Sequence, residues 1–243
     1  MLAAVFPGQG SQKPGMGQDL AQHSPAAQSV FDEVSAALGR DMMALCWTLD
    51  AEELRLTQNA QLALFTAGLA AWEALKSQGI KAKAFAGHSV GEYAALVASG
   101  ALSLAEGARL VQTRGELMAA AGTQRPGTMA AVLGLDAEPL AALCREVSTS
   151  SDLVVVANDN CPGQVVVSGD VDAVERLSAA APGAGAKRVL PLKVSGAFHS
   201  PLMTEPAAKM GQTVQAAVWG EQHSPVYSNV TAKPIQESSA WPG

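Results

Sequence analysis

The sequence predicts an α/β protein in which a mainly parallel sheet with helical crossovers is interrupted by a small inserted domain. Short apolar runs alternate with longer helical segments over the first part of the chain. An apolar strand runs directly into a helix through Gly87–Gly91. After Pro126-Gly127 the order and spacing of the predicted strands and helices change. With 243 residues, 48% of them hydrophobic and 16% charged, the chain is large and apolar enough to bury a substantial core.

The elements of the first part follow from apolar spacing and from the residues that end each helix. Gly39 and Gly79 follow two of the helices, and Ser103 with Glu106 forms a capping box at the start of a later one. Such an order of strand, helices, strand and helix is typical of parallel strands joined by crossovers. We expect strands at 2–6 and 82–86, and helices at 26–38, 58–78, 90–99 and 103–121.

The next part of the chain has the order β-α-β-β-α-β within about 70 residues, which is the ferredoxin-like pattern. Its strands are expected at 128–133, 153–157, 164–168 and 188–192, and its helices at 136–147 and 170–180. We therefore predict an inserted small domain at 127–194 and a large domain formed by 1–126 and 195–243. A helix ending near 218 and a strand at 225–230 follow. Residues 231–243 have little periodicity and resemble an interrupted loop, which predicts that the C-terminal part of the large domain is missing.

Composition excludes several classes of function. The net charge is −6 and no basic cluster is longer than Lys187-Arg188, which argues against nucleic-acid binding. No apolar run approaches the roughly 18 residues of a membrane span, and no basic segment precedes an apolar one at the N-terminus. The three cysteines form no C-x-x-C pair, which predicts buried or partly buried free thiols in a reducing cytoplasm. We expect no metal site.

The pentapeptide Gly87-His88-Ser89-Val90-Gly91 has the G-x-S-x-G pattern of a nucleophile elbow. Small residues on both sides allow the tight strand-to-helix turn that exposes the serine hydroxyl. At a helix N-terminus, free backbone N–H groups and the helix dipole favour an oxyanion. Ser89 is therefore the candidate nucleophile.

A serine hydroxyl needs a base at neutral pH, and His199 is the best candidate among four histidines. His23 and His223 lie in polar segments that are expected to be exposed. His88 adjoins the serine, and neighbouring residues on an elbow point in different directions. His199 follows the predicted return from the small domain, in a turn that would place its ring at a cleft edge. A structural role for a lone loop histidine remains the alternative.

Arg114 lies on the predicted helix 103–121 and has two possible roles. It could belong to a solvated face, pairing with Glu106 or Glu116. Alternatively, Gln112 and Arg114 mark the helix edge that faces the serine, where a guanidinium would bind a substrate carboxylate with two hydrogen bonds. The second role would select acyl groups that end in a carboxylate.

The glycine-rich loop Gly8–Gln12 follows the first predicted strand. It is not a Walker A loop, because Lys13 precedes Pro14 and no G-K-[ST] ending occurs. Gly8 and Gly10 are expected to let the backbone approach another element closely. The backbone N–H groups of Gln9 and Val90 would then converge on one oxygen as an oxyanion hole.

Taken together, these motifs resemble those of the malonyl-CoA:acyl carrier protein transacylase family, in the family's order and over the whole chain. The matching segments are Gly8–Gln12, Gly87–Tyr93, Gln112–Arg114, Asn158–Asn160 with Pro162, Gln164 and Ser168-Gly169, Gly196–Ser200, and Ser228–Val230.

The resemblance implies an enzyme that transfers acyl groups in two ping-pong steps. Ser89 would attack malonyl-CoA with His199 as general base, and the malonyl group would then pass to the phosphopantetheine thiol of acyl carrier protein. Arg114 would pair with the malonyl carboxylate, and Gln9 and Val90 would supply the oxyanion donors. Phe198 resembles malonyl-selective members. Coenzyme A enters as the thioester substrate, and no further cofactor is implied.

Other assignments are open at this stage. Asn160 and Gln164 would line the cleft or serve only the turn and the strand edge. Lys187, Arg188 and Lys193 are candidates for docking an acidic carrier protein. We expect a free-standing monomer that serves fatty-acid or polyketide synthesis. The family's histidine-orienting glutamine has no counterpart here.

Two alternatives have a different function. An α/β-hydrolase-type thioesterase would share the hydrolase-like core and the elbow, but it predicts an acidic orienter and an HGGG loop. No HGGG motif occurs, and the aspartates between Ser89 and His199 fall in the predicted small domain. An inactive paralogue that binds carrier protein is the other alternative.

Overall fold

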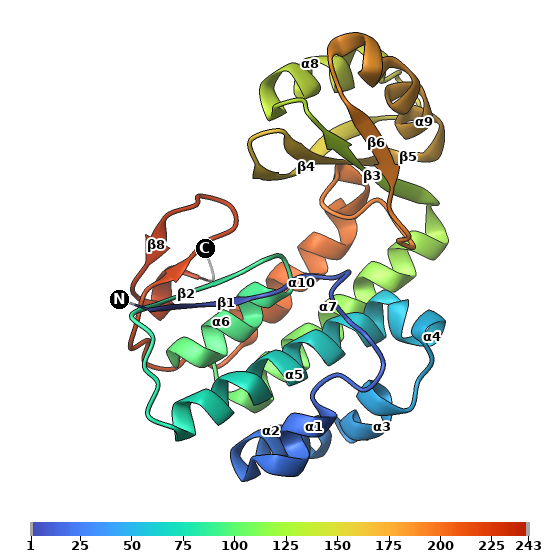
Figure 1. Ribbon diagram of the computed structural model, residues 1–243. Helices are drawn as coiled ribbons and strands as arrows, with labels where there is room; N and C mark the ends of the chain where they lie inside the picture. Colours follow the sequence, from blue (N-terminus) through green and yellow to red (C-terminus); the bar gives the residue numbers. More distant parts are fainter. Residues whose placement is uncertain (1, 242–243) are drawn as a thin grey trace. The chain divides into compact units, whose positions relative to one another are not determined.

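A computed structural model describes residues 2–241, and the chain forms two compact units (Figure 1). The first runs to Glu116 and resumes at Met210, and the second is Leu117–Lys209. The chain passes between the units within two helices, α7 (Leu104–Gln124) and α10 (Thr204–Ala216). The second unit thus extends beyond the small domain expected at 127–194, and the domain boundaries drawn from the sequence remain predictions.

The first unit is built on a sheet with the strand order β1-β2-β7-β8. β1, β2 and β7 are parallel, and β8 is antiparallel to β7. This confirms the predicted parallel core, although β7 is much shorter than the expected strand at 225–230. The strands are β1 (Ala3–Phe6), β2 (Ala84–Gly87), β7 (Val226–Tyr227) and β8 (Pro234–Ile235).

The helices of the first unit cluster around α5, which is apolar on nearly all sides and buried along most of its length. Trp72 of α5 packs edge-on against Phe85 of β2, with 5.2 Å between ring centroids. This contact ties the helix to the sheet next to the elbow. Besides α7 and α10, the helices are α1 (Gln18–His23), α2 (Pro25–Leu38), α3 (Met42–Trp47), α4 (Ala51–Arg55), α5 (Thr57–Ser77) and α6 (Gly91–Ser99).

Several short elements escaped the sequence prediction. Helices α3 and α4 have side-chain caps, because Asp41 accepts a hydrogen bond from the Ala44 N–H and Asp50 accepts from the Glu52 and Glu53 N–H groups. The segment 231–243 was expected as a loop, but its described part, which ends at residue 241, contributes β8. These elements are too short for apolar periodicity to indicate them.

The second unit has the predicted element order and an antiparallel sheet with the strand order β4-β5-β3-β6. Side chains alternate across it as strand geometry requires. Ala130, Val132 and Val165 pack with the helices α8 and α9, whereas Met129 and Val166 face a separate cluster that contains Phe198. The elements are β3 (Gly127–Leu133), α8 (Ala137–Val147), β4 (Val154–Cys161), β5 (Gln164–Asp170), α9 (Val171–Ala180) and β6 (Arg188–Pro191).

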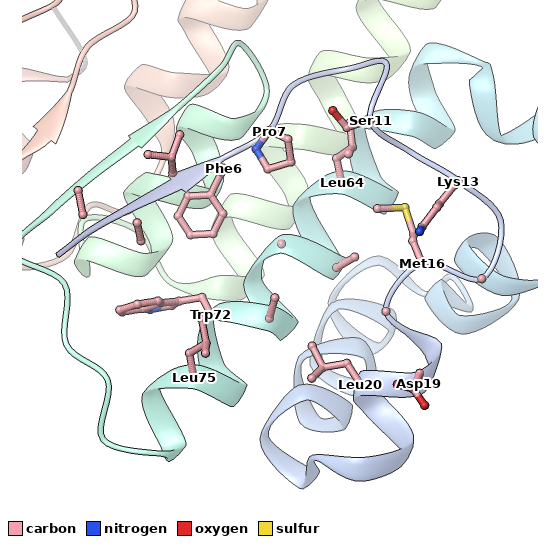
Figure 2. Close-up of a pocket in the computed structure, with 18 of the residues that line it drawn as sticks. Phe6, Pro7, Ser11, Lys13, Met16, Asp19, Leu20, Leu64, Trp72 and Leu75 are labelled. Carbon is pink, nitrogen blue, oxygen red and sulfur yellow. The ribbon is translucent and has the colours of Figure 1, made fainter.

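An apolar groove of about 760 Å³ lies in the first unit between β1 and helices α1 and α5 (Figure 2). Phe6, Met16, Trp72, Leu75 and Lys13 are among the residues that line it. Ser89 is not among the residues that line this groove, so the candidate nucleophile lies outside it.

Candidate active site

The strand-to-helix turn at Ser89 has the strained geometry of a nucleophile elbow. Ser89 has φ of 51°, in the left-handed region that a non-glycine residue adopts at a cost of about 1–3 kcal/mol. A Cβ on Gly87 would lie 1.9 Å from the Gly91 carbonyl carbon, and one on Gly91 would lie 2.4 Å from the Phe6 oxygen. Both glycines of G-x-S-x-G are therefore required, because any side chain would collide with backbone.

Asn229, just beyond β7, holds the elbow through two side-chain hydrogen bonds. Its Oδ1 accepts from the Ser89 N–H at 3.1 Å, and its Nδ2 donates to the Gly87 carbonyl at 2.8 Å. Its backbone N–H also donates to Glu92 Oε1 at 2.8 Å. Asn229 lies in one of the segments that resemble the family, but its contact with Ser89 was not predicted, because 140 positions separate the two residues.

Arg114 of α7 contacts the candidate nucleophile directly. Its Nη2 donates to Ser89 Oγ at 3.0 Å, and its Nη1 donates to Gln61 Oε1 on α5. The guanidinium carbon also lies 5.9 Å from the centre of the Tyr93 ring. Glu106, one of the acidic partners considered above, instead pairs with Arg109. The arginine therefore belongs to the elbow.

Burial controls the protonation of this cluster. It lowers the pKa of Arg114, while Tyr93 and Glu92 oppose that shift by stabilising the positive charge. It raises the pKa of Tyr93, an effect that Arg114 opposes and Glu92 reinforces. The guanidinium stays protonated at neutral pH because the ordinary pKa of arginine is far above 7, and the raised pKa of Tyr93 keeps its phenol neutral.

The glycine-rich loop reaches the elbow through Gly8. A Cβ on Gly8 would lie 2.3 Å from His88 Nδ1, so close approach explains this glycine. Gly10 differs, because a Cβ there would meet no atom within 4 Å, and its φ of 112° is what requires glycine. No hydrogen bond of the Gln9 or Val90 N–H occurs within residues 2–241. Both N–H groups are thus available for an oxyanion.

His199 lies in the second unit, in a tight turn with φ of 58°. Phe198 before it is buried with Met118, Met129 and Val166. Ser200 after it donates through Oγ to the Ala197 carbonyl at 2.6 Å. The turn is thus anchored on both sides of the histidine. Ser89 belongs to the first unit, so the pairing of Ser89 with His199 stays a prediction.

Asn160 and Gln164 lie on the β4–β5 hairpin of the second unit, and both are exposed. Cys161 pairs with Gln164 across the ladder, and its thiol lies 3.6 Å from Gln164 Oε1. β4 extends to Cys161, four residues beyond the expected end. Cys161 is exposed, so the expectation that all three thiols are at least partly buried was wrong for this one. A role for the hairpin in binding stays a prediction.

Among the residues that the structure describes, no group of three or more His, Cys, Asp and Glu side chains is placed to hold a metal ion. No helix within residues 2–241 combines the length and apolarity needed to cross a membrane.

Comparison with known proteins identifies the family. Residues 4–240 match the acyl transferase domain model. The chain belongs to this family. A malonyl CoA-acyl carrier protein transacylase of Bacillus subtilis is 46% identical over 238 residues, which are 98% of this chain and 75% of that protein. One from Escherichia coli K12 is 45% identical over 233 residues, with 96% and 75% covered.

Solved structures of the acyl transferase family agree with this assignment. A transacylase from Coxiella burnetii has a TM-score of 0.94 at 36% identity, with 99% of this chain and 76% of that one covered. A malonyl-transacylase in complex with a type II PKS acyl-carrier protein has a TM-score of 0.92 at 41% identity, with 99% and 78% covered. The α/β fold of this chain, with one mixed and one antiparallel sheet, therefore matches the fold of solved malonyl transacylases.

Proposed function

We propose that this protein transfers a malonyl group from malonyl-CoA to the phosphopantetheine thiol of acyl carrier protein, with a malonyl ester on Ser89 as the intermediate. The observation that carries the proposal is the 3.0 Å hydrogen bond from Arg114 to Ser89 Oγ. It places a fixed cation where the acyl group of an acyl-serine would begin. A guanidinium binds a carboxylate through two parallel hydrogen bonds, which suits an acyl group with a carboxylate end.

The chemistry consists of two matched acyl transfers. The Ser89 oxygen attacks the thioester carbonyl while His199 takes the hydroxyl proton, and the coenzyme A thiolate leaves with that proton. The carrier thiol then attacks the serine ester, His199 again accepts the proton, and Ser89 regains it as the ester breaks. The Gln9 and Val90 N–H groups stabilise the oxyanion at each stage, where one donor typically contributes ~10²–10³ in rate.

The remaining assignments belong to the same proposal. Phe198 shapes the malonyl pocket, and Asn160 and Gln164 line the cleft from the β4–β5 hairpin. We assign the second unit to the ferredoxin-like class, with 127–194 as the inserted domain, and the first unit to a hydrolase-like core. The protein acts as a cytoplasmic monomer on malonyl-CoA and acyl carrier protein, in fatty-acid or polyketide synthesis. It needs no metal or further cofactor and binds neither nucleic acid nor membrane.

Substitution of Arg114 tests the proposal. Arg114→Ala should lower acylation by malonyl-CoA about 10- to 150-fold, because a hydrogen bond to a charged group contributes about 1.5–3 kcal/mol. Acylation by acetyl-CoA should persist. Arg109→Ala is the matched control, since Arg109 lies on the same helix with an exposed side chain. Equal loss of malonyl and acetyl transfer in Arg114→Ala would refute carboxylate recognition by Arg114.

The fate of the malonyl group separates transferase from hydrolase. With malonyl-CoA and carrier protein present, the product should be malonyl carrier protein. Free malonate as the main product would support the thioesterase alternative instead.

A further inference from the structure

We infer that Thr57 and Gln61, on the first turns of α5, are positioning residues that fix the Arg114 guanidinium and tie it to the Gln9 loop. Neither residue is expected to touch substrate. The inference rests on the proposed function, because it assigns malonyl selectivity to a hydrogen-bonded chain behind Arg114.

Four side chains form an unbroken series of hydrogen bonds that ends at the nucleophile. Arg114 donates through Nη2 to Ser89 and through Nη1 to Gln61 Oε1. Gln61 Nε2 donates to Thr57 Oγ1 at 2.9 Å, and Thr57 Oγ1 donates to Gln9 Oε1 at 2.9 Å. Thr57 and Gln61 are fully buried, at 0% exposure, and lie one helical turn apart.

The direction of every hydrogen bond in this series is fixed by the arginine. A guanidinium can only donate, so Gln61 must present Oε1 to it and therefore Nε2 to Thr57. The Thr57 oxygen must then accept from Gln61, which leaves its single proton for Gln9. A buried chain with one direction is strengthened by polarisation, and breaking one link leaves unpaired polar groups on both sides.

A close crossing of two helices brings Arg114 of α7 next to Gln61 of α5. A Cβ on Gly115, next to Arg114, would lie 2.9 Å from Gln58 Cα on α5. Only glycine permits this approach, which places the α7 backbone against the α5 turn that carries Thr57 and Gln61. The carboxylate-binding arginine and the loop with the proposed oxyanion donor are thereby held by one helix.

Threonine-to-valine substitutions provide a matched test. Thr57→Val keeps the side-chain shape but removes the hydroxyl that both accepts from Gln61 and donates to Gln9. The malonyl-to-acetyl ratio of Ser89 acylation should fall about tenfold, and Thr57→Ser should restore it to within about twofold, because only the hydroxyl matters. Thr66→Val is the control, since Thr66 lies on the same helix, is equally buried, and has an Oγ1 without a partner in the described chain.

The ratio decides the outcome, because a purely structural defect would lower both acylations together. The inference would be overturned if Thr57→Val had the same malonyl-to-acetyl ratio as the control Thr66→Val. If Thr57→Val does not fold, Gln61→Glu gives a second test. Its carboxylate would pair with Arg114 and lower malonyl acylation about 10- to 100-fold while sparing acetyl acylation. An unchanged ratio in Gln61→Glu would also contradict the positioning role.

Comparison with Arg114→Ala separates this inference from the proposed function. If Arg114→Ala keeps the wild-type ratio, the assignment of Arg114 to carboxylate recognition fails. If the malonyl-to-acetyl ratio falls in Arg114→Ala but stays at the wild-type value in Thr57→Val and Gln61→Glu, the proposed function stands and only the positioning role fails.

Discussion

The substitution Asn229→Ala tests whether the side chain of Asn229 stabilises the nucleophile elbow. The substitution removes the acceptor for the Ser89 N–H and the donor to the Gly87 carbonyl. It leaves the backbone bond from Asn229 to Glu92 in place. Any effect therefore reports on the two side-chain bonds.

The size of the expected effect on acylation follows from the backbone strain at Ser89 that these two hydrogen bonds oppose. Two hydrogen bonds stabilise the folded site by about 1–3 kcal/mol in total, and the left-handed Ser89 costs about 1–3 kcal/mol. Because Asn229 is exposed, water replaces part of what is lost, which favours the lower half of that range. A loss of about 1–2 kcal/mol in the elbow corresponds to a 5- to 30-fold slower acylation of Ser89.

The assay is the rate of Ser89 acylation by malonyl-CoA, followed by intact mass, together with the melting temperature. Val230→Ala is the neighbouring control, because that side chain is 93% exposed. An Asn229→Ala protein that acylates at the rate of Val230→Ala would refute the idea that Asn229 holds the elbow.

Three further predictions concern packing and titration. Gly91→Ala should lower the free energy of unfolding by about 1–3 kcal/mol in a denaturant titration, because the new methyl group would lie 2.4 Å from the Phe6 oxygen; an unchanged midpoint would contradict this. Burial raises the pKa of Cys46 to about 12 and that of Cys144 to about 11, so alkylation at pH 8 should modify the exposed Cys161 and leave the other two unmodified in the native protein. These two thiols ionise more readily in the unfolded chain, so their contribution to stability is complete below about pH 9 and is lost as the pH rises toward 11–12. Urea titrations between pH 8 and 10.5 should therefore show a falling free energy of unfolding, and a constant value would contradict this.

The strands and helices with strong local patterns were predictable from the sequence, whereas the order of the strands in each sheet was not. The apolar runs became β1 and β2, and the β-α-β-β-α-β order of the second unit follows from strand and helix periodicity. The short helices α3 and α4 were not found from apolar spacing, although Asp41 and Asp50 carry a capping signal. β7 ends at Tyr227, because the chain turns after Ser228, whose carbonyl accepts a hydrogen bond from the Ala232 N–H at 2.9 Å.

Site residues were predictable where a single short segment contains the functional motif. Residues that reach the site from distant segments were harder to predict. Ser89 could be found from its own pentapeptide, and Arg114 could be offered only as one of two alternatives. Thr57 and Gln61 were predicted only as part of, or next to, a long apolar helix. Two polar residues four positions apart on such a helix do indicate a buried polar contact. Asn229 gave no signal of its contact with the elbow, because that contact depends on parallel pairing of β2 with β7.

The role of Ser89 as the acyl-accepting residue can be tested by measuring the mass of the protein after exposure to malonyl-CoA and mapping the modified peptide. One malonyl group should be found on Ser89, should be absent in Ser89→Ala, and should leave when acyl carrier protein is added. A malonyl group on another residue, or an unmodified Ser89 in the folded protein, would contradict the proposal that Ser89 carries the malonyl group.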